Sequence, residues 1–106
     1  MTSFSSREKA FEDKFAHDEE MQFRARARRN RLFGQWVAES IGLGEAEARL
    51  YGERMVTEDL KEAGDEDVFR AVEADLAERK VEISRHRLEK KLEDFMREAK
   101  AQLAGE

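Results

Sequence analysis

The chain has 106 residues, of which 40% are hydrophobic and 42% charged, and its formal net charge at pH 7 is −5. This length suits one domain, and the absence of cysteine excludes disulfides, thiol chemistry and thiolate metal sites. The acidic balance argues against a nucleic-acid binder that acts through its overall field. Because the chain has no proline and disperses charges of both signs, its composition predicts an all-α protein.

The first predicted element is one continuous helix from Ser5 to Ile41. Its apolar residues recur mostly at multiples of three and four, as one helix face requires: Phe4, Phe11, Phe15, Phe23, Ala27, Phe33, Val37 and Ile41. Such a helix is roughly 55 Å long, whereas a compact chain of this size has a radius of gyration of roughly 13 Å. Part of the stretch must therefore lie outside the globule, as a projecting helix or a disordered tail.

The first helix divides by the width of its apolar face. Residues 1–20 carry only a narrow stripe and three basic against six acidic residues, a net charge of −3. Such a segment is marginal as an isolated helix and gains order by docking. We therefore expect a flexible N-terminal segment over 1–20 that continues into a four-helix bundle over 21–106, with packing that begins around Met21 to Arg29. Within that packed part, Gly34 indicates close helix packing.

Three further helices complete the predicted bundle. Gly42 provides a left-handed stop, and a second helix runs from Glu45 to about Ala63. Gly64 ends that helix and Asp65 caps a third. A break within Glu78 to Ser84, with Ser84 as the next cap, separates the third helix from a fourth that Gly105 ends. The alternative is one uninterrupted helix from Asp65 to Leu103. The predicted apolar face of the second helix consists of Leu50, Tyr51, Met55, Val56 and Leu60.

The search for catalytic or metal-binding residues yields little. His17 precedes three acidic residues, which suits either a pH-sensitive switch or an ordinary solvated side chain. Glu82, His86 and Glu89 have a spacing that permits metal ligands on one helix face, but chance explains it in a glutamate-rich chain. Glycine-rich phosphate loops and nucleophile triads have no sequence support. We predict no enzyme activity, no cofactor and no metal.

The strongest charge signal is a run of five arginines, followed by no acidic residue until Glu39: Arg24, Arg26, Arg28, Arg29 and Arg31. One interpretation is a site for nucleotide phosphates, nucleic acid or an acidic protein surface, with Arg24, Arg28, Arg29 and Arg31 as the candidate phosphate ligands. The other is local neutralisation of the acidic helices that follow. Separately, Phe4, Phe11 and Phe15 suit anchors for a groove on a partner, or packing back onto the bundle.

Three stretches carry a family resemblance over essentially the whole chain. They are residues 11–20 (FEDKFAHDEE), residues 27–32 (ARRNRL) with the following Gly34-x-Trp36, and residues 62–68 (EAGDEDV). Together they strongly resemble the zeta-subunit inhibitor of the alphaproteobacterial ATP synthase. Two features depart from the family pattern. Arg26 stands where an acidic residue is expected, and Glu78 to Ser84 lacks the expected turn residues.

The resemblance implies a protein inhibitor of ATP hydrolysis. In this family the N-terminal segment, flexible when free, becomes helical and wedges into the closing catalytic interface of the synthase's soluble head, against the central rotor. Carried over by position, the inhibitory residues are Phe4, Arg7, Glu8, Lys9, Phe11, Lys14, Phe15 and His17. The implied partners are the catalytic and rotor subunits, and the alternative function is a bundle that binds nucleotide.

Neither a secretory signal nor an apolar run long enough to span a bilayer is visible in the sequence. We expect a cytoplasmic protein, monomeric when free and peripheral to the inner membrane through the synthase, with no membrane or nucleic-acid contact of its own.

Overall fold

The computed structural model describes the backbone of residues 2–106 and the side chains of residues 17–106. It contains four helices in this part of the chain: α1 (Thr2–Ser40), α2 (Glu45–Asp59), α3 (Glu66–Arg79) and α4 (Arg85–Ala104). α1 packs against α2 and α4, and α2 packs against α3. The predicted all-α fold with four helices, the first of them continuous from the N-terminal segment, is thereby confirmed.

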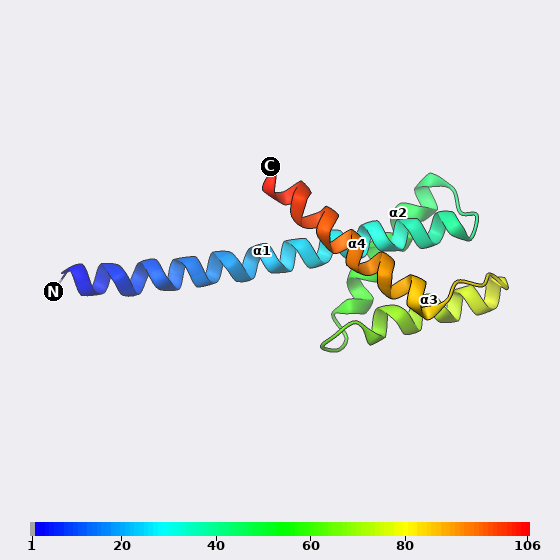
Figure 1. Ribbon diagram of the computed structural model, residues 1–106, viewed down its shortest axis with the longest axis horizontal. Helices are drawn as coiled ribbons and strands as arrows, with labels where there is room; N and C mark the ends of the chain where they lie inside the picture. Colours follow the sequence, from blue (N-terminus) through cyan, green and yellow to red (C-terminus); the bar gives the residue numbers. More distant parts are fainter. Residues whose placement is uncertain (1) are drawn as a thin grey trace.

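α1 is both the spine of the bundle and a projection from it. Its N-terminal part extends well beyond the other three helices (Figure 1), and the molecule measures 65 × 27 × 22 Å along its principal axes. Residues 17–20 are exposed, and the first buried side chain among residues 17–40 of α1 is Ala25. Packing therefore begins within the predicted range of Met21 to Arg29.

α1 and α2 approach closely at a pair of glycines. A Cβ placed on Gly34 would lie 2.7 Å from Cα of Gly52 and 3.1 Å from the carbonyl oxygen of Tyr51. A Cβ on Gly52 would in turn lie 2.8 Å from the carbonyl oxygen of Arg31. The interpretation of Gly34 as a close-packing residue is therefore correct.

The hydrophobic core lies where α1 meets the other helices. Phe33 and Val37 of α1 are fully buried, and the aromatic ring of Phe33 packs edge-on against Phe69 of α3. Other fully buried side chains come from each remaining helix: Met55, Val68, Val72 and Leu88. The predicted face of α2 is wrong at Leu50 and Leu60, which are 72% and 67% exposed. The buried residues of α2 are instead Ala48, Tyr51, Gly52, Met55 and Asp59. Gly52 and Met55 lie against Gly34 of α1, whereas the Tyr51 hydroxyl donates to Asp75 of α3.

The α1–α2 and α2–α3 connections contain the predicted glycines, but α2 is shorter than predicted. Gly42 has a φ of 85°, and the hydrogen bond from the amide of Leu43 to the carbonyl oxygen of Ala38 closes a Schellman motif. α2 ends at Asp59 rather than near Ala63, and Gly64 has a φ of 84°. Asp65 precedes α3 as predicted, but its side chain makes no capping hydrogen bond.

The break between α3 and α4 confirms the predicted boundary and excludes the uninterrupted helix. Lys80 adopts the left-handed conformation (φ 57°), a position that usually belongs to glycine. The amide of Val81 donates to the carbonyl oxygen of Leu76, again as in a Schellman motif. The Ser84 hydroxyl then accepts a hydrogen bond from the amide of Arg87 and caps α4. Val81 and Ile83 pack against the core beneath this connection.

In the part of the chain that the structure describes, no helix is both long and apolar enough to span a bilayer.

Candidate functional site at the root of the projecting helix

The predicted inhibitory residues all fall on α1, in or next to its projecting part. Phe4, Arg7, Glu8, Lys9, Phe11, Lys14 and Phe15 have side chains outside the described residues. His17 is the first side chain that the structure describes, and it is exposed. The structural detail therefore begins at the root of the projection, which we define as residues 21–31 of α1 with the side chains that surround them.

Arg26 joins α1 to the connection between α2 and α3. Its Nε and one Nη lie 2.5 and 2.9 Å from the two carboxylate oxygens of Asp59, a bidentate pair. The same Nη donates to the carbonyl oxygen of Gly64 at 2.8 Å and to a carboxylate oxygen of Asp65 at 3.0 Å. One guanidinium group thus fixes the end of α2, the left-handed glycine and the start of α3.

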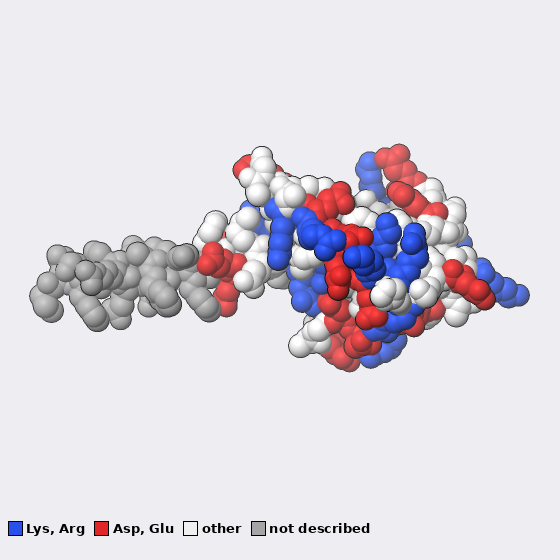
Figure 2. Space-filling view, in the orientation of Figure 1, with Lys and Arg blue, Asp and Glu red and all other residues white. Residues whose placement is uncertain are grey.

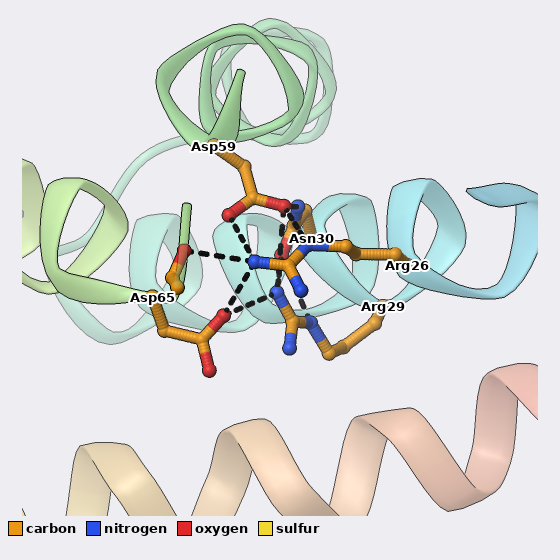
Figure 3. A network of polar contacts seen from close by, with 6 residues as sticks. Arg26, Arg29, Asn30, Asp59 and Asp65 are labelled. Carbon is orange, nitrogen blue, oxygen red and sulfur yellow. Dashed lines mark hydrogen bonds and ion pairs between the residues drawn. The ribbon is translucent and has the colours of Figure 1, made fainter. Parts of the chain in front are cut away.

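Arg29 and Asn30 complete this network beneath Arg26 (Figure 3). Both side chains are buried, and Arg29 donates to the Asn30 amide oxygen while pairing with Asp65 at 3.0 Å. The Asn30 amide nitrogen donates to Asp59 at 2.8 Å. Because the buried carboxylate and guanidinium groups all have partners, the network avoids the cost of an isolated buried charge.

The network shifts the ionisation of its central pair. Burial by itself would raise the pKa of Asp59, but hydrogen bonds from Arg26 and Asn30 and the charges of Arg26 and Arg29 outweigh it and hold that pKa below its ordinary value. The hydrogen bond to Asp59, opposed by burial, raises the pKa of Arg26. Both groups are therefore held in their charged forms.

The remaining arginines of the cluster also contact carboxylates. Arg24 and Arg28 lie 3.2 and 2.6 Å from the side chain of Glu106, which ties the end of the α4 segment to the root of α1. Arg31 pairs with Glu53 of α2 at 2.6 Å. Basic and acidic side chains are interspersed over the visible face of the bundle (Figure 2). These contacts support local neutralisation, because carboxylates already occupy the guanidinium groups; the phosphate-binding alternative stays a prediction.

Metal chemistry gains no structural support from the described side chains. Among residues 17–106, no three or more His, Asp or Glu side chains are grouped so as to hold a metal ion. Glu82 lies before α4 begins at Arg85, so the helical spacing assumed for Glu82, His86 and Glu89 is wrong.

The fold and the site together define an all-α bundle whose longest helix extends beyond it and is fixed at its root by buried ion pairs. The family model for ATPase inhibitor subunit zeta matches residues 1–102, and the chain belongs to this family of ATPase inhibitors. A structure titled "Solution NMR structure of the protein" is 45% identical, with a TM-score of 0.72 over 80% of this chain and 96% of that one. A comparison with curated protein sequences gave no match.

Proposed function

We propose that this chain stops ATP hydrolysis by inserting its residues 1–17 into the closing catalytic interface of the ATP synthase head. The observation that carries the proposal is the length of α1: 39 residues form one helix that extends well beyond the bundle (Figure 1), and among its described side chains (17–40) burial begins at Ala25. The zeta-inhibitor family provides the target. The protein then acts as a non-catalytic regulator, cytoplasmic and peripheral to the membrane through the synthase.

The difference between the projecting part of α1 and its part within the bundle supports this mechanism. A helix without an apolar groove to cover it gains little stability by itself, so the projecting part gains most by binding. The bundle keeps that part near its target after the first contact and so raises its effective concentration. The root network prevents the helix from swinging at the point where it leaves the bundle, because Arg26 and Arg29 tie it to Asp59 and Asp65.

The test is an ATPase assay on the purified synthase head from the source organism. We expect the full chain to inhibit, and a variant that lacks residues 1–15 to lose inhibition. Circular dichroism and the fluorescence of the single tryptophan, Trp36, would show whether the truncated bundle is folded. A folded truncated chain that still inhibits fully would refute the assignment of the segment.

A further inference from the structure

Two exposed apolar side chains meet at the root of α1. Of the large hydrophobic residues among 17–106, three are exposed: Phe23, Leu50 and Leu60, at 60%, 72% and 67%. Phe23 and Leu60 line the same small cavity of about 70 Å³, together with Ala27, Val56 and the network residues Arg26, Asn30 and Asp59. Exposed single hydrophobic residues are ordinary, but two that adjoin form a patch that calls for a partner.

A second hollow adjoins Phe23, a groove of about 510 Å³ between α1 and α4. Phe23, Ala25 and Met96 are its apolar lining residues, and the others are polar or charged: Glu19, Gln22, Arg26 and Lys100. Phe23 is thus a ridge between two hollows, one toward the end of α2 and one toward α4. We call Phe23, Leu60 and the half-buried Met96 the root patch.

The ion-pair network holds the root patch in place. Leu60 directly follows Asp59, whose carboxylate is clamped by Arg26 and Asn30. Arg26 also lines both hollows beside Phe23. The same contacts that end α2 at Asp59 therefore present Leu60 next to Phe23, although exposure of both side chains to water is unfavourable.

The position of the patch identifies what covers it. Figure 1 shows that the α2–α3 connection and the C-terminal end of α4 both lie at the end of the bundle from which α1 projects. The molecule measures 27 × 22 Å along its two shorter axes, whereas a helix with its side chains is about 10–12 Å wide. A crevice that admits the helix therefore stops the bundle at its rim, and the root patch lies at that stop. The Cα–Cβ bond of Phe23 also tilts toward the N-terminus of α1, the direction of insertion.

We propose that the root patch is a second docking surface, which packs on the rim of the catalytic interface in the synthase head when residues 1–17 are inserted. This inference rests on the proposed function. Phe23 follows Phe15 by eight residues, about 12 Å along the helix axis, so a head that holds Phe15 comes within reach of Phe23. The projecting segment blocks the catalytic interface, while the root patch sets the depth of insertion and slows release.

The test compares full-length variants in the ATPase assay. Phe23→Gln with Leu60→Gln removes the patch, and Leu50→Gln is the matched control because Leu50 is equally exposed but does not line either hollow. We expect the patch variant to raise the inhibition constant at least tenfold with the maximal inhibition unchanged, and the control to leave both unchanged. Thermal unfolding would confirm that all three chains fold alike.

Other outcomes separate this inference from the proposed function. If deletion of residues 1–15 abolishes inhibition but the patch variant inhibits like the wild type, the root patch has no role and only this inference fails. If the deletion variant still inhibits, the proposed function fails.

Analytical sedimentation tests another occupant of the root patch. A wild-type dimer that becomes a monomer in the patch variant would show that a second copy of this chain, and not the synthase head, covers the patch. A photo-reactive residue at position 23, compared with one at 50, reports contact with the head directly: cross-linking at 23 alone supports the patch, and equal labelling contradicts it.

Discussion

Gly34 of α1 and Gly52 of α2 face each other so closely that neither position has room for a methyl group, since a Cβ on Gly34 would lie 2.7 Å from Cα of Gly52. Two of the three nearest atoms, Cα of Gly52 and the carbonyl oxygen of Tyr51, belong to the backbone, which cannot rotate away as the Met55 side chain can. Gly34→Ala must therefore push α1 and α2 apart, and we expect it to lower the free energy of unfolding by about 1–3 kcal/mol.

Urea unfolding followed by Trp36 fluorescence would measure this loss. At an open position in a helix, the same change would instead stabilise by about 1 kcal/mol, because alanine has the higher helix propensity. A Gly34→Ala variant that is more stable than the wild type would therefore show that the two helices do not meet here.

The glycine pair also shows how far sequence patterns reach. The apolar spacing predicted the four helices, and Gly34 inside a helix indicated close packing. Hydrophobicity alone assigned Leu50 and Leu60 to the face of α2, because a pattern that scores size and apolarity overlooks Ala48 and Gly52. Which side of α2 is buried depends on how closely α1 can approach it, and this cannot be read from the sequence of α2 alone.

Arg26 and Asp59 should contribute measurably to stability. Asp59 is buried while the Arg26 side chain is 39% exposed, so solvent screens part of the interaction. We expect Arg26→Gln to cost about 2 kcal/mol, less than for a fully buried pair. A double-mutant cycle with Asp59→Asn would isolate the coupling, and additive single effects would contradict it.

The same pair predicts a pH dependence. Because the pKa of Asp59 is lower in the folded than in the unfolded chain, its contribution is fully present above the unfolded value of about 3.9 and is lost as the pH falls through the folded value. Unfolding free energies measured between pH 7 and pH 2 should therefore fall less steeply for Asp59→Asn than for the wild type. Equal slopes would mean that Asp59 titrates normally.

Lys80 occupies a backbone conformation that glycine adopts without cost. The left-handed region costs a residue with a side chain roughly 1–2 kcal/mol, and φ at Lys80 is 57°. We expect Lys80→Gly to stabilise the bundle by up to about 1 kcal/mol, since part of the gain is lost to the flexibility of glycine in the unfolded chain. The converse change, Gly42→Ala at a φ of 85°, should destabilise it. A rise in melting temperature for the first and a fall for the second is the expected result.

Tyr51 is the single tyrosine, so its ionisation can be followed by absorbance without interference. Burial, with a hydrogen bond of 2.7 Å to the Asp75 carboxylate, raises the pKa of Tyr51 well above its ordinary value of 10.0. The folded protein should therefore show no tyrosinate at pH 10, whereas the chain in urea should be about half ionised. Tyrosinate in the folded chain at that pH would contradict the hydrogen bond.

Phe11 is one of the three predicted apolar anchors of the inhibitory segment, with Phe4 and Phe15. Phe11→Ala should weaken inhibition by about 2 kcal/mol, near thirtyfold in the inhibition constant, if truncation removes a central contact. Glu39→Ala, at an exposed position near the other end of the same helix, provides a control for helix propensity. An inhibition constant unchanged by Phe11→Ala would remove Phe11 from the interface.

At the root of α1, part of the site could not be predicted from the sequence. The arginine run was evident, and local neutralisation was one of its two interpretations. Its partners, however, lie between 22 and 82 residues away along the chain, at Glu53, Asp59, Asp65 and Glu106. No spacing rule links residues at such separations. The early end of α2 was missed as well: it falls at Asp59, the partner of Arg26, and nothing in the local sequence marks that position.

Because α1 is continuous, the number of residues between two of its positions also fixes the angle between them around the helix axis. Eight residues from Phe15 to Phe23 turn a helix by about 80° beyond two full turns, because each residue contributes about 100°. With no break between Thr2 and Ser40, the orientation of the bundle around the inserted segment is fixed by counting residues. The number of residues between Phe15 and Phe23 therefore sets the angle around the helix axis between the inhibitory segment and the root patch. This holds whatever the side chains of the intervening residues contact.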